Sequence, residues 1–107
     1  MEIGTVKIEK PIILAPMEDV TDTAFRIICK RLGADIVYTE FTSSEAIIRG
    51  IPRVMQKIKI TDEERPIGIQ LFGGVETSVS DAARLAESYG PDFIDINCGC
   101  WVKNHVA

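Results

Sequence analysis

IGIQLFGGVETSVSDAARLAESYGPDFIDI, at residues 67–96, places two short β-rich runs on either side of an amphipathic stretch. The runs Ile67–Leu71 and Phe93–Ile96 are rich in isoleucine, leucine and phenylalanine, as buried strands are. Between them, small and apolar residues recur at helical spacing from about Glu76 to Tyr89, and Gly90-Pro91 ends the helix. A strand, a helix and a strand in this order predict two parallel strands joined by a right-handed crossover.

The same alternation extends toward the N-terminus. Two further β-rich runs, Ile12–Ala15 and Ile36–Thr39, flank a segment with apolar residues at i, i+3, i+4 and i+7. We expect a helix there that begins near Thr21, whose hydroxyl caps free backbone N–H groups, and that ends at Gly33 in a left-handed conformation. The apolar face of this helix consists of Phe25, Ile28, Cys29 and Leu32.

A shorter helix is predicted after the second run. Thr42-Ser-Ser-Glu45 has the pattern of a capping box, in which two side chains satisfy each other's backbone donors. Gly50 ends this helix, and Pro52 prevents its continuation. The segment from Arg53 to Asp62 is predicted to be partly helical and to end in a polar turn.

Strands that alternate with helices predict an α/β fold with a parallel sheet. The alternation alone does not separate an open, doubly wound sheet from a barrel, since both are built from the same unit. In either fold the chemistry is found at the C-terminal ends of the strands. No low-complexity tract or flexible linker interrupts the sequence, so residues 1–107 are expected to belong to one domain.

The composition fits a globular protein with an apolar core. Of 107 residues, 46% are hydrophobic, and 12 basic against 16 acidic residues give a net charge of −4, which does not suggest nucleic-acid binding. Three cysteines make no disulfide framework and fit the reducing cytoplasm. The N-terminus lacks the pattern of a signal peptide, and no apolar stretch approaches the roughly 20 residues that span a bilayer, so we expect a soluble protein.

Polar side chains are found where the predicted strands end. Gln70 interrupts an apolar strand, where a buried amide must be hydrogen-bonded, either within a structural network or to a ligand. Asp95 and Asn97 are two residues apart on a strand and therefore share one face. A turn-forming role at the strand end would explain Asn97, but it leaves Asp95 without a reason.

The sequence Cys98-Gly99-Cys100 contains two of the three cysteines. It does not favour a zinc site, because there is no second cysteine pair and the single histidine, His105, has no partner. Cys29 and Cys98 are expected to be buried as small apolar residues. Cys100 differs, because it follows a glycine at a strand end, where a loop is exposed to a ligand.

Five groups of residues have the order and spacing of a known family. They are Leu14–Asp22 followed by Phe25-Arg26, Tyr38–Phe41 with Ser43-Ser44, Glu64–Pro66, Ile69–Gly73 and Asp95–Cys100. Together they resemble the bacterial tRNA-dihydrouridine synthases. The resemblance extends over essentially the whole chain, although no single group of residues would suffice for it.

The resemblance implies a parallel (β/α) barrel of the TIM type, with FMN at its C-terminal mouth and a separate helical domain that helps to hold tRNA. It also implies an oxidoreductase that reduces the C5=C6 bond of a tRNA uridine, with NADPH reducing FMN and the flavin passing hydride to C6. A complete barrel takes about 250 residues, so residues 1–107 are expected to form about the first half, without the helical domain, and to be inactive alone.

The resemblance also assigns roles to individual residues. Pro16, Met17 and Glu18 would lie against the flavin, Gln70 would hydrogen-bond the flavin ring, Asn97 would contact the target uracil, and Cys100 would protonate C5. A thiol with the ordinary pKa of about 8.5 is protonated at neutral pH, which suits a proton donor. The chain departs from the family at Trp101, where a proline is common.

Two other functions are compatible with a chain of this kind. One is another FMN barrel acting on pyrimidines, such as a dihydroorotate dehydrogenase, against which the sequence Asn97–Cys100 argues. The other is a noncatalytic assembly module. No metal is implied, and neither the tRNA position nor the oligomeric state follows from the sequence.

Overall fold

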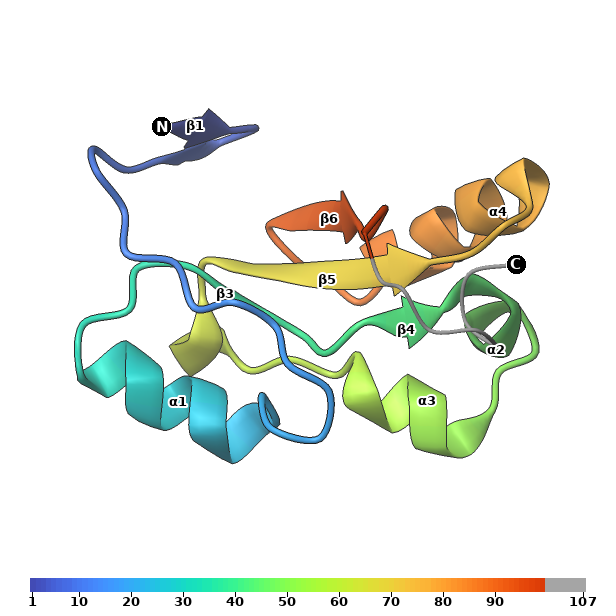
Figure 1. Cartoon of the computed structure of the whole chain (residues 1–107), viewed down its shortest axis with the longest axis horizontal. Coiled ribbons are helices and arrows are strands. Elements are labelled where there is room, and N and C mark those ends of the chain that lie inside the picture. Colours follow the sequence, from blue (N-terminus) through green and yellow to red (C-terminus); the bar gives the residue numbers. More distant parts are fainter. Residues whose placement is uncertain (100–107) are drawn as a thin grey trace.

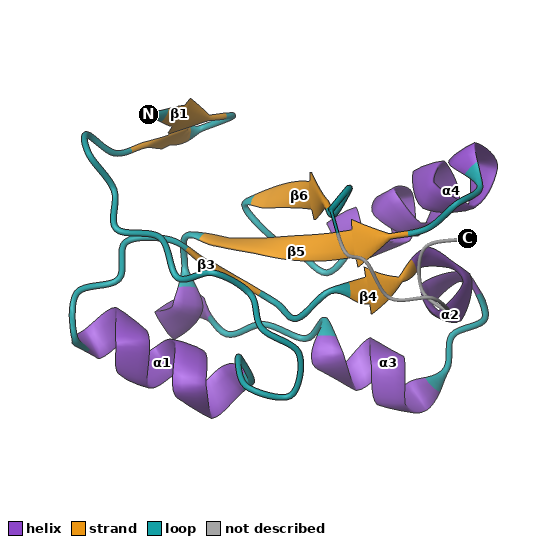
Figure 2. Cartoon of the chain, in the orientation of Figure 1, coloured by secondary structure: helices purple, strands orange, loops and turns teal. Residues whose placement is uncertain are grey.

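The computed structural model of the chain describes residues 1–99 (Figure 1). Helices and strands alternate along most of this length, as Figure 2 shows. In chain order they are β1 (Glu2–Ile3), β2 (Val6–Lys7), α1 (Thr23–Arg31), β3 (Val37–Tyr38), β4 (Thr42–Ser43), α2 (Ser44–Ile48), α3 (Pro52–Lys57), the 3₁₀ turn η1 (Asp62–Glu64), β5 (Ile67–Phe72), α4 (Glu76–Glu87) and β6 (Phe93–Ile96). Within residues 1–99, no helix has the length and apolar character needed to cross a membrane.

β5 is the centre of a parallel sheet. Gly68 pairs with both Tyr38 of β3 and Phe93 of β6, so these two strands lie on opposite edges of β5. Leu71 likewise pairs with both β4 and β6. β3 and β4 therefore follow one another along one edge, and β6 lies along the other (Figure 1). The predicted α/β fold with a parallel sheet is confirmed.

A further segment of the chain extends the sheet beyond β3. Ile13 forms a parallel bridge with Ile36, and the Leu14 N–H donates to the Ile36 carbonyl at 2.9 Å. The pairing is shorter than the predicted strand Ile12–Ala15, because the segment has only one neighbouring strand and is flanked by prolines, which donate no backbone hydrogen bond. The strands thus follow one another in space in the order in which they occur in the chain.

β3 and β4 are two parts of one strand that is interrupted by a bulge. Four residue steps separate Tyr38 from Thr42, whereas three steps separate their partners Gly68 and Leu71. One extra residue is therefore accommodated opposite β5, and it shifts the alternation of side chains between the two faces. Glu40, within the bulge, is buried although it is charged.

Alternate residues of β5 lie on the two faces of the sheet. Ile69 and Leu71 point toward the helices, whereas Gly68, Gln70 and Phe72 lie on the opposite face. The buried cluster on the helix side comprises Ile47, Ile58, Ile69, Leu71, Ala82 and Ala86. α4 contributes Ala82 and Ala86 to it, which confirms the apolar stripe expected for this helix.

The helix starts differ from the predicted ones in detail. Asp22, not Thr21, caps α1, and its carboxylate accepts from the Phe25 N–H at 2.8 Å. Thr21 is fully buried, and its hydroxyl is bonded to the Met17 backbone instead. The predicted left-handed end at Gly33 is confirmed by its φ of 113°.

The capping box is found at another place than expected. α2 is capped by Ser43, whose hydroxyl accepts from the Ala46 N–H at 3.4 Å, while Thr42 belongs to β4. A capping box is formed instead at η1, by Thr61 and Glu64. α3 begins at Pro52, one residue before the segment predicted to be partly helical, and Pro52 occupies its first turn, where a missing N–H does no harm. The hairpin of β1 and β2 was not expected.

Candidate functional site

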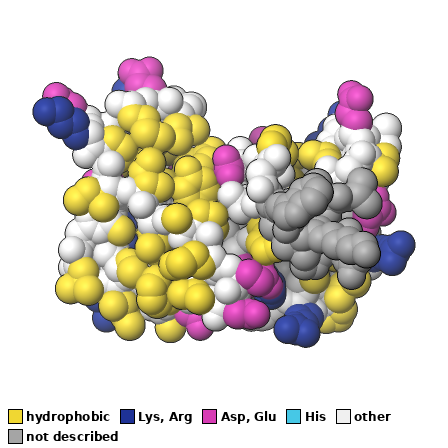
Figure 3. Space-filling model, in the orientation of Figure 1, with side chains coloured by type: hydrophobic (Ala, Val, Ile, Leu, Met, Phe, Trp, Pro, Cys, Tyr) yellow, Lys and Arg dark blue, Asp and Glu magenta, His cyan; other side chains and the backbone are white. Residues whose placement is uncertain are grey.

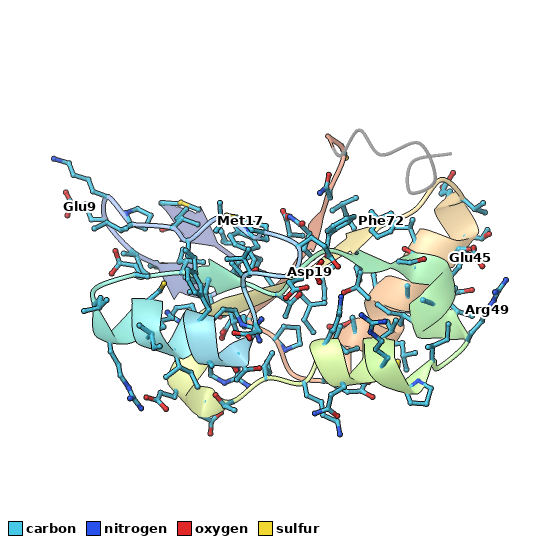
Figure 4. The ribbon with its side chains drawn as sticks, turned by 60° about the horizontal axis from the view of Figure 1, so that its bottom comes forward. Glu9, Met17, Asp19, Glu45, Arg49 and Phe72 are labelled. Carbon is cyan, nitrogen blue, oxygen red and sulfur yellow. The ribbon has the colours of Figure 1, made fainter. Side chains whose placement is uncertain are left out.

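The loop that leads into α1 is held by its own backbone and by a buried arginine. The Thr21 hydroxyl accepts from the Met17 N–H at 3.0 Å and donates to the Met17 carbonyl at 3.1 Å. Arg26, 2% exposed, donates from Nη1 to the Thr21 carbonyl at 2.6 Å. The loop therefore has a fixed shape with Met17, 43% exposed, at its surface (Figure 4).

The same arginine connects α1 to the turn before β5. Its Nε lies 2.6 Å from Oε1 of Glu64, which is fully buried. The second carboxylate oxygen of Glu64 accepts from the Thr61 N–H at 2.7 Å and from its hydroxyl at 3.0 Å. Both charges are thus paired and hydrogen-bonded, which is the condition under which buried ions are tolerated.

Glu18 is directed toward α3. The Lys57 ammonium lies 3.0 Å from Oε1 of Glu18 and 3.4 Å from Oε2 of Glu40, and the Asp19 N–H donates to that same oxygen of Glu40 at 3.2 Å. Burial lowers the pKa of Lys57, but the hydrogen bond and charge of Glu18, with the charge of Glu40, outweigh burial and raise it. The carboxylates of Glu18, Asp19 and Glu40 lie together, and Lys57 already supplies a positive charge to them.

A hollow of about 220 Å³ lies beside this ion pair, between the start of α1 and α3. It is lined by Asp22, Thr23, Arg26, Glu40, Arg53, Gln56 and Lys57. Among residues 1–99, none of those expected to contact a flavin or a uracil lines it. The hollow is therefore separate from the group of residues described next.

Gln70, Asp95 and Asn97 form a hydrogen-bonded group on the face of the sheet opposite the core. Gln70 and Asp95 are paired directly across β5 and β6, and Nε2 of Gln70 donates to Oδ2 of Asp95 at 2.7 Å. Nδ2 of Asn97 donates to Oε1 of Gln70 at 3.4 Å. The structure thus brings Gln70 and Asn97 together. It also explains Asp95, for which the sequence indicated no role, because its carboxylate accepts a hydrogen bond from Gln70.

Aromatic rings lie on either side of this polar group. Tyr38 and Phe93 meet edge to face with centroids 5.4 Å apart, near the start of β5. Phe41 and Phe72 lie with centroids 4.8 Å apart, at the C-terminal end of β5 (Figure 4). Burial and the negative charge of Asp95 both raise the pKa of Tyr38, so its hydroxyl stays protonated at neutral pH. The polar group is therefore partly buried between two pairs of aromatic rings, and its lower exposure to water strengthens its hydrogen bonds.

Of the two cysteines that follow β6, Cys98 belongs to the described residues. Cys100 lies outside the described residues. Cys98 is exposed, with its thiol directed to the Ile96 carbonyl at 3.7 Å, so the expectation that it is buried is wrong. The reason is its position two residues past the end of β6, in a loop, and loops run over the surface of a protein. Cys29 is half-buried in α1.

The chain is an α/β protein with a parallel sheet, and Gln70, Asp95 and Asn97 lie together on one of its faces. Residues 13–106 match the family model described as dihydrouridine synthase. The chain belongs to the dihydrouridine synthase family.

Its relatives are bacterial proteins of the same kind. The chain is 50% identical over 93 residues to a probable tRNA-dihydrouridine synthase of Aquifex aeolicus, covering 85% of this chain and 29% of the relative. It is 39% identical to the tRNA-dihydrouridine synthase B of Xanthomonas axonopodis pv. citri, covering 96% and 31%. A probable tRNA-dihydrouridine synthase of Rickettsia prowazekii is 38% identical, covering 100% and 33%. The chain thus spans about a third of the length of these curated relatives.

Proposed function

We propose that the protein containing this chain reduces uridine to 5,6-dihydrouridine in tRNA, in the cytoplasm, with FMN as cofactor and NADPH as reductant. The observation that carries the proposal is the match to dihydrouridine synthases over residues 13–106. The hydrogen-bonded group of Gln70, Asp95 and Asn97 at the strand ends supports it, because an amide that both donates and accepts suits a flavin or pyrimidine edge.

We further propose that the chain is the N-terminal part of a single (β/α)8 barrel, whose later half and helical tRNA-binding domain belong to the same protein. The spatial order of the strands supports this, because it equals the chain order, whereas a doubly wound sheet reverses its order. Apolar side chains exposed over α1 and the segment preceding it also support it (Figure 3). Ile12, Ile28 and Leu32 are 66%, 54% and 84% exposed, and in a closed barrel a neighbouring unit would cover this apolar surface.

An isoalloxazine ring would lie on the face that carries Gln70, because the amide of this residue both donates and accepts. Pro16 and Met17 follow the first segment of the sheet at its C-terminal end, and Met17 presents an exposed thioether side chain. We assign Pro16, Met17 and Gln70 to the flavin, with Glu18 holding the loop through Lys57. When bound and reduced by NADPH, FMN would supply the hydride for C6 of the uracil.

The remaining steps fall to residues at the end of β6. Asn97 would orient the uracil, and the Gly99 N–H donates to its Oδ1 at 2.9 Å, which fixes its amide. Cys100, as a neutral thiol, would donate the proton that C5 takes up as the double bond is reduced. The uridine must leave its stack to reach these groups, as in other enzymes that act on a base.

The test uses the complete protein that contains this chain, with tRNA purified from a strain that lacks the gene. We expect the purified protein to carry FMN, to oxidise NADPH and to form dihydrouridine detected by mass spectrometry. Cys100→Ala should keep FMN and its reduction by NADPH but lose most dihydrouridine formation, whereas the neighbouring control Cys98→Ala should keep all three.

Two outcomes would count against the proposal at different levels. Normal dihydrouridine formation by Cys100→Ala would exclude this cysteine as the proton donor and leave the activity intact. Oxidation of free dihydroorotate without any reaction on tRNA would refute the activity itself and favour a dihydroorotate dehydrogenase.

A further inference from the structure

We propose that Asp95 is a positioning residue, which fixes the orientation of the Gln70 amide so that its remaining donor and acceptor face the imide edge of a flavin. The inference rests on the proposed function, since it takes Gln70 as a flavin contact. It assigns a role to a carboxylate that itself touches neither cofactor nor substrate.

The orientation of Gln70 follows from what Asp95 is able to do. An ionised carboxylate only accepts hydrogen bonds, so the group that faces it at 2.7 Å must be the amide nitrogen of Gln70. The two residues are direct partners across β5 and β6, so the side chains meet without any bend of the backbone. The backbone N–H of Gln70 is also held, by the Thr39 hydroxyl at 3.1 Å.

The hydrogen bond from Asn97 favours the same orientation of the Gln70 amide. The Gly99 N–H donates to Oδ1 of Asn97 at 2.9 Å, so the nitrogen of this amide is the atom turned to Gln70. Nδ2 of Asn97 then donates to Oε1 of Gln70, at the longer distance of 3.4 Å. Asp95 and Asn97 therefore act together, and the shorter, charge-assisted bond to Asp95 is the stronger of the two.

The Gln70 amide has hydrogen-bonding groups that these two bonds do not use. A primary amide carries two N–H donors and two carbonyl lone pairs, and the bonds to Asp95 and Asn97 take one of each among residues 1–99. This leaves one donor and one acceptor, and these are the groups that the C=O and N–H of an imide require. Gln70 is 8% exposed, so a reversed amide would set acceptor against acceptor at Asp95 and donor against donor at Asn97, where little water compensates.

An isosteric exchange separates positioning from a merely structural bond. Asp95→Asn removes the charge that fixes Gln70 and should raise the dissociation constant for FMN about tenfold or more, the range of a lost charge-assisted hydrogen bond. The double variant Gln70→Glu with Asp95→Asn restores a hydrogen bond between the two positions with donor and acceptor exchanged. It should regain the melting temperature of the wild type but still bind FMN weakly, because a carboxylate at position 70 offers no N–H.

The measurements are FMN titration by fluorescence quenching and thermal unfolding of the apoprotein, both on the complete protein that contains this chain. Wild-type affinity in Asp95→Asn, or recovery of affinity together with stability in the double variant, would overturn the inference and leave the proposed function standing. Failure of the wild type to bind FMN would refute the proposed function and this inference with it.

Discussion

Glu64→Gln should destabilise the protein far more than the neighbouring change Glu63→Gln. Both glutamates pair with an arginine of α1, so the two contacts join the same elements and differ mainly in burial. Arg26 and Glu64 are 2% and 0% exposed in their side chains, whereas Arg31 and Glu63 are 69% and 48% exposed. The two variants therefore form a matched pair.

The expected magnitudes follow from that difference. Breaking a buried pair leaves an uncompensated charge and costs about 3–5 kcal/mol, whereas an exposed pair contributes about 0–1 kcal/mol. In the wild type, one carboxylate oxygen of Glu64 accepts two hydrogen bonds from Thr61. If the amide nitrogen introduced by Glu64→Gln faces Thr61, at most one hydrogen bond with Thr61 remains. A loss near 4 kcal/mol would be a large part of the total stability of a domain, which is about 5–15 kcal/mol.

Urea unfolding followed by far-UV circular dichroism measures both variants. The double variant Arg26→Met with Glu64→Leu is the informative control, because it removes both charges and should be less destabilised than Glu64→Gln alone. Equal losses for Glu63→Gln and Glu64→Gln would show that burial does not govern these pairs, and the reasoning would be refuted.

Two other predictions concern Lys57 and Gly68. Since the folded-state pKa of Lys57 is raised above 10.5, its stabilisation is complete below that pH and is lost as pH rises through the folded pKa. The unfolding free energy of the wild type relative to Lys57→Met should be constant at neutral pH and fall in the alkaline range; a difference that stays constant there would contradict the raised pKa. A Cβ at Gly68 would lie 2.3 Å from Cε2 of Phe93, so Gly68→Ala should destabilise by about 1–3 kcal/mol. The loss should be smaller in a Phe93→Leu background, and equal losses in urea unfolding would show that the ring is not the obstacle.

The features predicted correctly from sequence are those that depend on residues close together in the chain. α4 and the strands on either side of it follow from spacing and from the Gly90-Pro91 stop, and alternation along a strand placed Asp95 and Asn97 on one face. The start of α1 shows the limit of such patterns, because Thr21 and Asp22 are both good caps. Which of them caps the helix is decided by the bond of Thr21 to the Met17 backbone, a contact of the folded loop.

Contacts between distant residues were not predictable in the same way. Nothing near Arg26 indicates that its partner is Glu64, 38 residues later, and nothing near Glu18 indicates Lys57. The arrangement of the candidate site was predictable in part. Parallel strands bring Gln70 near Asn97 by rule, but the bond of Gln70 to Asp95 depends on the register of β5 and β6, which no local pattern specifies.

The bulge between β3 and β4 makes the length of that segment as informative as its composition. Removing one residue between Tyr38 and Thr42 would leave three steps opposite three, so the bulge would become regular pairing while Thr42 stays opposite Leu71. Substitutions in this segment alter one contact each, whereas such a deletion would change the backbone that presents Glu40 to Lys57 and to the Asp19 N–H. Over evolutionary time, gaps should therefore be selected against here, whichever residues fill the positions.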